Sequence, residues 1–120
     1  MRVLVVDRSS GFRDLVRRAV TESGHGEIVG HVARAEEATS AVAEHRPDVV
    51  LMARSLPDHD GVWATRQIKV LFPHVDVVAL TAAGDGAAGE AFMAAGATAR
   101  FDKEDLPGVL RWLAEERPPP

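Results

Sequence analysis

The sequence predicts a single α/β domain built around a parallel sheet. Its 120 residues suit one domain with one hydrophobic core. Five short apolar runs, rich in β-branched side chains, indicate strands, most of them buried on both faces. Each run is followed by a segment with helical periodicity. This alternation is typical of right-handed crossovers that place helices on both faces of a parallel sheet.

The first strand and the first helix have clear signals. Residues 3–6 form an apolar run that ends at Asp7. Apolar residues then recur at helical spacing, with Ser9 or Ser10 as the expected N-cap and Gly24 as the expected stop.

The sequence pattern of the second strand is weak, and the patterns of the elements that follow it are clearer. Residues 27–32 alternate imperfectly, which favours a strand near an edge of the sheet. A stripe of small residues predicts a helix over 35–45, and Pro47 ends it because the residue before a proline disfavours helical geometry. Residues 48–52 form the third strand. The loop 53–61 holds most of the turn-forming residues, and such loops often carry function.

The second half of the chain repeats the alternation. A helix is expected over 64–71, a fourth strand over 75–80, and a short, weak helix over 82–95, where Ala and Gly are frequent. Residues 98–101 form a brief fifth strand. The last helix has Pro107 in its first turn. Its expected buried face consists of Val109, Leu110 and Leu113.

Composition excludes several classes of function. The chain has 14 Lys and Arg against 18 Asp and Glu, a formal net charge of −4, so it has no global attraction to nucleic acid or to an anionic membrane. It contains no cysteine, which excludes disulfides and zinc sites of the Cys type. No apolar run approaches a membrane span and no signal peptide is evident, so we expect a cytoplasmic protein.

Polar residues gather at the expected carboxyl ends of the strands, where open α/β sheets bind their ligands. These ends carry Asp7 and Arg8, Ala53 to Ser55, Thr81 and Ala82, and Asp102 and Lys103. In this order they resemble the receiver domain of bacterial two-component response regulators, over residues 2–116. The neighbouring segments Pro47 to Met52, Leu56-Pro57, Asp60-Gly61, Leu80 to Ala82 and Ala95 to Ala97 fit as well. The resemblance implies the flavodoxin-like (βα)5 receiver fold, with strand order 2-1-3-4-5. It also implies that the first and last helices share one face of the sheet.

The family's phosphorylation site is degenerate in this sequence. In the family, an acidic pair and a phosphoaccepting Asp hold Mg²⁺, and a Thr or Ser and a Lys complete the site. The matching residues here are Asp7, Arg8, Ala53, Thr81 and Lys103. They carry a net charge of +1, where the family's three acids and one Lys give −2, and the Ala53 methyl group cannot form an aspartyl phosphate. We therefore expect no metal, no cofactor and no catalytic residue, and a pseudo-receiver instead of an enzyme.

The family's readout is altered too. Arg100 replaces the aromatic residue that follows the strand-four Thr when the family's domain is phosphorylated. Gly84, Gly86 and Gly89 each weaken the helix that follows strand four by about 1 kcal/mol relative to Ala. The residues expected in a signalling or interaction surface are Phe92, Arg100, Phe101 and Trp112.

Three functions remain open at this stage. The first is signalling without phosphorylation, by dimerisation or by docking a protein partner. The second is a phosphoacceptor disabled by an Asp-to-Ala change at Ala53, or one whose phosphate has moved elsewhere, for example to Asp58 or Asp60, although both fit a turn. The third is a sensor of an anion or small ligand held by Arg8, Thr81 and Lys103. Arg8 either forms a surface ion pair with Asp7 or enters the vacated metal pocket.

Two further patterns carry less weight. Residues 84–89 spell G-x-G-x-x-G, but the chain has no room for a second nucleotide-binding half, so a flexible loop is the better interpretation. The five histidines show no i, i+4 pair and are interpreted as surface residues outside any metal site.

The expected domain spans residues 1–117, and Pro118 to Pro120 form a tail or the stub of a linker. Through the resemblance, a longer protein with a C-terminal DNA-binding effector domain is a further expectation. No direct contact of this domain with nucleic acid or membrane is expected, so any role in transcriptional regulation would pass through an effector or a partner.

Overall fold

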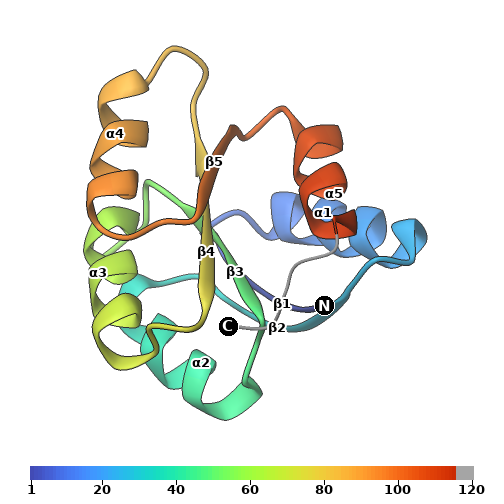
Figure 1. Cartoon of the computed structure of the whole chain (residues 1–120), viewed down its shortest axis with the longest axis horizontal. Coiled ribbons are helices and arrows are strands. Elements are labelled where there is room, and N and C mark those ends of the chain that lie inside the picture. The colour runs from blue at the N-terminus through green and yellow to red at the C-terminus, as the bar shows by residue number, and fades with distance from the viewer. Residues whose placement is uncertain (116–120) are drawn as a thin grey trace.

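The computed structural model describes residues 1–115, which form a five-stranded parallel sheet with helices on both faces (Figure 1). The strands are β1 (Arg2–Val6), β2 (Glu27–Val32), β3 (Val49–Ala53), β4 (Asp76–Thr81) and β5 (Ala99–Asp102). The helices are α1 (Ser10–Ser23), the 3-10 turn η1 (Ala35–Glu37), α2 (Ala38–His45), α3 (Gly61–Leu71), α4 (Gly86–Ala94) and α5 (Leu106–Ala114). The expected tail, residues 118–120, and the last two residues of the expected domain lie outside the described residues.

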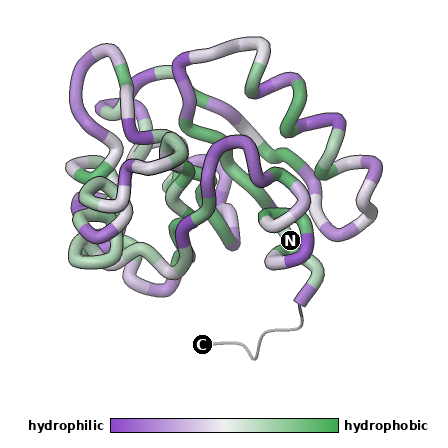
Figure 2. The backbone as a smooth tube through the Cα atoms, turned by 90° about the horizontal axis from the view of Figure 1, so that it is seen from above, coloured by the Kyte–Doolittle hydropathy of each residue, from purple (hydrophilic) through white to green (hydrophobic). Residues whose placement is uncertain are grey.

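The strand order is β2-β1-β3-β4-β5, so the predicted fold class and topology are confirmed. Alternate residues of the central strands point to opposite faces of the sheet, and both faces are buried because helices cover each one. One face packs against α1 and α5, and the other against α2, α3 and α4. In Figure 2 the strands appear as hydrophobic segments that run through the middle of the molecule.

Local capping explains where the helices begin. Ser9, not Ser10, caps α1 by accepting a hydrogen bond from the Phe12 N–H at 3.2 Å, and Gly24 ends this helix in the left-handed region at a φ of 74°. The helix α4 begins at Gly86, four residues later than expected, because Asp85 acts as its N-cap. Before that cap the chain forms a turn instead of helix.

A close approach of two elements fixes the start of α3. The Gly61 N–H donates a 2.7 Å hydrogen bond to the Arg54 carbonyl. A Cβ at position 61 would overlap the Ala53 carbonyl and lie 3.1 Å from the Phe92 ring. Only glycine leaves room for β3, α3 and Phe92 to meet at this point.

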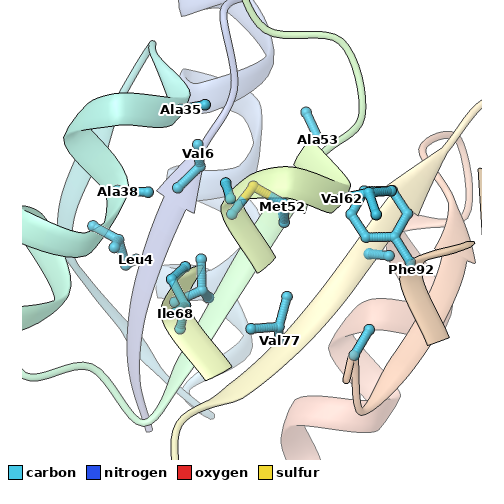
Figure 3. Close-up of a cluster of buried hydrophobic side chains, with 14 of the residues drawn as sticks. Leu4, Val6, Ala35, Ala38, Met52, Ala53, Val62, Ile68, Val77 and Phe92 are labelled. Atoms are coloured by element: carbon cyan, nitrogen blue, oxygen red, sulfur yellow. The ribbon is translucent and has the colours of Figure 1, made fainter. Parts of the chain in front are cut away.

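Phe92 lies inside the core, with none of its surface exposed (Figure 3). It packs in the cluster that also contains Met52, Val62 and Val77. The expectation that Phe92 belongs to an interaction surface is therefore wrong. The tip of its ring lies 3.1 Å from where a Cβ of Gly61 would be, so the ring packs closely against this glycine.

The described helices contain no candidate membrane span, because none combines sufficient length with sufficient apolar character. The longest of them, α1, has 14 residues.

Candidate functional site

The carboxyl ends of four parallel strands meet at one edge of the sheet. The strand register pairs Val6 with Met52 and Ala53 with Leu80, and it pairs Thr81 with Asp102. The residues that directly follow or end these strands are therefore neighbours. They are Asp7, Ala53, Thr81 and Lys103, four of the five positions predicted from the sequence.

Asp7 is a buried carboxylate with two defined contacts. Its Oδ1 accepts a 2.8 Å hydrogen bond from the Ser9 N–H. Its Oδ2 lies 2.7 Å from the Lys103 Nζ, although this approach lacks hydrogen-bond geometry and no other described residue donates to Oδ2. The backbone carbonyl of Asp7 accepts a hydrogen bond from the Arg13 guanidinium. The charge of Asp7 is thus balanced by an ammonium group within the chain.

Several contacts hold Lys103 in this position. Its backbone N–H donates to the Thr81 carbonyl at 2.7 Å, which fixes the start of the loop after β5. Its Nζ lies 4.3 Å from the centroid of the Phe12 ring, at cation–π distance. The side chain is 37% exposed, so the ammonium group keeps partial access to water while it pairs with Asp7.

This arrangement does not fit Mg²⁺. A magnesium site needs several oxygen ligands close to octahedral geometry. Here Asp7 supplies a carboxylate that is already paired with Lys103, and Ala53, only 4% exposed, presents a methyl group. Arg8 adds a further positive charge to this edge of the sheet. Lys103 thus balances the charge of Asp7, and the net charge of +1 at the strand ends does not favour a divalent cation.

Arg8 is exposed, which contradicts one of its two expected roles, entry into the vacated pocket. Side chains of consecutive residues at a strand end point in opposite directions, so a buried Asp7 directs Arg8 outward. Within residues 1–115, no ion pair joins Asp7 to Arg8. Thr81 and Lys103 line a cavity of about 410 Å³ with Phe12 and other residues, and Arg8 is not among them. Of the expected anion-binding residues, only Thr81 and Lys103 therefore line this cavity.

Comparison with known families identifies the family to which this chain belongs. The model of the response regulator receiver domain matches residues 3–111. The chain belongs to the response regulator receiver domain family. The domain of a response regulator is a signal-transduction module, so this membership also places the chain in two-component signalling.

Individual relatives support the same assignment. The receiver is 29% identical to the chemotaxis protein CheY of Thermotoga maritima over 86 residues, which cover 72% of this chain and 71% of CheY. It is 36% identical to the response regulator GacA of Pseudomonas viridiflava, over 68% of this chain and 38% of GacA. The chain matches 28% of the length of a protein-glutamate methylesterase from Hahella chejuensis, at 35% identity. It thus spans less than half of several relatives that it matches.

Solved structures agree with the fold. The response regulator domain of Thermotoga maritima CheB has a TM-score of 0.84, with 22% identity and 98% of each chain covered. A LuxR-family response regulator from Aurantimonas has a TM-score of 0.83 at 27% identity, over 97% of this chain and 86% of that one.

The remaining predicted residues of this receiver lie on the α4–β5–α5 face, which we define by Arg100, Phe101 and Trp112. Figure 1 shows α4 and α5 on opposite sides of β5. Arg100 is exposed, whereas Phe101 and Trp112 are half-buried and pack against the core cluster under α1 and α5. The Arg100 side chain crosses Gly89 of α4, where a Cβ would meet its guanidinium.

Sequence analysis missed a cluster beside α3. The Glu36 and His59 side chains form a 3.2 Å contact between Oε1 and Nε2, and the His59 ring stacks on Trp63 with centroids 4.0 Å apart. Asp58, His59 and Glu36 place ligand atoms within 4.8 Å of one another. The interpretation of His59 as an isolated surface residue is therefore incomplete. No local pattern could reveal this cluster, because Glu36 and His59 are 23 residues apart.

Asp58 forms the backbone link of this cluster. Its carboxylate accepts hydrogen bonds from the Ala35 N–H at 2.8 Å and from the Glu36 N–H at 2.9 Å, at the start of η1. Desolvation raises the pKa of Asp58, but these bonds and the N–H groups of His59 and of Asp58 itself outweigh it and lower the pKa from 3.8 to about 2. Asp58 was predicted to form a turn, and in the structure its side chain also binds the start of η1.

The lowered pKa of Asp58 predicts a pH-dependent stability. Because the pKa is lower in the folded state, the contribution is complete above about pH 4 and is lost as the pH falls from about 4 to about 2. We expect Asp58→Ala to lower the melting temperature by roughly 4 °C at pH 7, and the difference from wild type to shrink below pH 4. Thermal unfolding between pH 3 and pH 7 measures this, with exposed Asp14→Ala as the control. A difference that stays constant over the whole range would contradict it.

Proposed function

We propose that this receiver domain signals without phosphorylation, by forming dimers or by docking a protein partner. The observation that carries the proposal is the pairing of buried Asp7 with Lys103 beside the methyl group of Ala53. A receiver that accepts a phosphoryl group needs a nucleophilic carboxylate, a bound cation, and a lysine free to meet the new charge. At this edge the nucleophile is absent and the lysine is engaged with the buried acid.

The proposed output surface is the α4–β5–α5 face. Arg100 supplies an exposed charge on the α4 side of β5, and Phe101 and Trp112 supply partly exposed aromatic surface on the α5 side. Arginine and aromatic side chains are common at interface centres. Relatives such as the transcriptional regulatory protein DegU of Brevibacillus brevis are longer than this chain. A C-terminal effector domain and a role in transcription therefore belong to the proposal, as does a cytoplasmic location. The domain itself acts as a module without catalysis.

The two alternatives have less support. An anion sensor would need Arg8 next to Thr81 and Lys103, but Arg8 does not line their cavity and Glu104 does. A phosphate transferred to Asp58 or Asp60 would need a free carboxylate. Asp58 accepts two backbone hydrogen bonds, and Asp60 caps α3 through the Val62 N–H at 2.6 Å.

The chemical half of the proposal is tested by intact-protein mass after incubation with Mg²⁺ and a small-molecule phosphodonor. We expect the wild type to keep its mass. The double variant Arg8→Asp/Ala53→Asp restores three acids and is expected to gain a phosphoryl group, which shows that the donor is active. A phosphorylated wild type would overturn the proposal. Asp58→Asn and Asp60→Asn would then identify the acceptor.

The interface half is tested by sedimentation equilibrium over a range of protein concentrations. We expect Arg100→Glu to weaken self-association about tenfold or more, because reversed charge at an interface centre opposes its partner group. Arg17→Glu is the matched control, since this exposed residue on α1 changes charge in the same way on another surface. Self-association that Arg100→Glu leaves intact would contradict an interface on this face. A monomeric wild type would contradict dimerisation and leave only partner docking.

A further inference from the structure

The residue that follows Ala53 links two loops at the carboxyl edge of the sheet. The Arg54 Nη1 donates a 2.9 Å hydrogen bond to Oδ2 of Asp85 in the β4–α4 loop. The Arg54 Nε lies 3.8 Å from Oδ2 of Asp60 in the β3–α3 loop. The Arg54 side chain is 49% exposed and the Asp85 side chain 27% exposed, so the pair lies at the surface and water screens it in part.

Asp60 and Asp85 are the N-cap residues of α3 and α4. In each of them one carboxylate oxygen caps the helix and the other faces Arg54. The Asp60 Oδ1 accepts a hydrogen bond from the Val62 N–H at the start of α3. The Asp85 Oδ1 accepts one from the Ala88 N–H at the start of α4. In both residues the other oxygen, Oδ2, faces Arg54. One guanidinium group therefore joins the caps of two consecutive helices.

Electrostatics show that the acids hold the arginine in place. A cation near the N-terminus of a helix is unfavourable, because that end carries partial positive charge. Arg54 lies near two such ends. Its position is accounted for by Asp60 and Asp85, each of which favours both its own helix and the guanidinium.

The start of α4 is rich in glycine. It contains Gly86 and Gly89, and Gly84 precedes it at a φ of 83°. The Arg100 side chain packs over Gly89, so a shift of the first turns of α4 would move Arg100. The cap at Asp85 is thus coupled to the α4–β5–α5 face.

We propose that Arg54 is a positioning residue that permanently tethers the start of α4 and so holds the α4–β5–α5 face in one arrangement without a phosphoryl group. In the family, phosphorylation acts between the end of the third strand and the residue that ends the fourth. In this chain an ion pair spans the same two loops without a phosphoryl group. This inference rests on the proposed function, because a fixed tether replaces a switch only in a domain that is not phosphorylated.

The test is a double-variant cycle followed by amide hydrogen exchange and mass spectrometry. Arg54→Met removes the charge and keeps the length of the side chain. Asp85→Asn removes the charge and keeps an oxygen that can cap α4, because Asn and Asp are equally good N-caps. The double variant carries both changes. Arg8→Met is the matched control, since it removes an exposed arginine from the same edge of the sheet without touching either cap.

We expect each single variant to raise the exchange rate of the amides in residues 86–94 and 99–102 about fivefold, the factor that corresponds to about 1 kcal/mol. The double variant should exchange no faster than either single one, because both remove the same interaction. Arg8→Met should match the wild type. Exchange in β1 and β3 should stay unchanged in every variant, which shows that the fold is intact.

Two results would overturn the tether. One is exchange in α4 that no variant changes. The other is a double variant whose rate is the product of the two single effects, because that would mean that Arg54 and Asp85 act independently. The measurement uses no phosphodonor, so it separates the two proposals. If Arg54 and Asp85 show no coupling in hydrogen exchange, the tether is refuted but phosphorylation-independent signalling is not. If the wild type is phosphorylated, phosphorylation-independent signalling is refuted but the ion pair is not.

Discussion

The ion pair between Asp7 and Lys103 is the interaction on which the rest of the carboxyl edge depends. A carboxylate without any exposed surface is costly unless it is paired or hydrogen-bonded. Asp7 obtains one hydrogen bond from the Ser9 N–H, and Lys103 supplies the opposite charge. In return, the Lys103 backbone holds the β5–α5 loop against Thr81. Neutralisation from within the chain leaves a divalent cation without a role at this position.

The other substitutions at the edge are consistent with this charge balance. Ala53 adds no charge where a second carboxylate would require a cation, and Arg8 points outward instead of competing with Lys103. Arg54 pairs with Asp60 and Asp85, the N-cap residues of α3 and α4. Each positive group therefore has a separate environment. These contacts fit the proposal of a domain that presents one surface without phosphorylation.

Most of the fold could be predicted because its signals are local. Every expected strand lies within one residue of its place, since apolar runs of β-branched residues report burial directly. The edge position of β2 and the end of α1 at Gly24 also followed from local patterns. The start of α4 could not be predicted in this way, because the turn before it contains the same residue types, Ala and Gly, as the helix. Only the hydrogen bond of the Asp85 side chain marks the first residue of α4.

The site was only partly predictable, for tertiary reasons. The positions of Asp7, Ala53, Thr81 and Lys103 follow from the order of the strands, but the partner of Asp7 does not. The expectation for Phe92 was wrong because the side chain packs in the core close to Gly61, 31 residues earlier in the chain. The link from Arg54 to Asp85 likewise joins residues 31 positions apart. Such pairs become visible only when the loops are placed in space.

The most direct test of the account is a titration of the wild-type protein with MgCl₂, followed by the backbone amide signals of residues 7–9, 53 and 103 in two-dimensional NMR. Ionic strength is held constant with NaCl, and Arg8→Asp/Ala53→Asp serves as the variant that restores the acids. The account predicts saturable shifts in the variant and none in the wild type up to tens of millimolar Mg²⁺. Saturable shifts at Asp7 and Lys103 in the wild type would contradict it, because they would show that a divalent cation displaces the ammonium group.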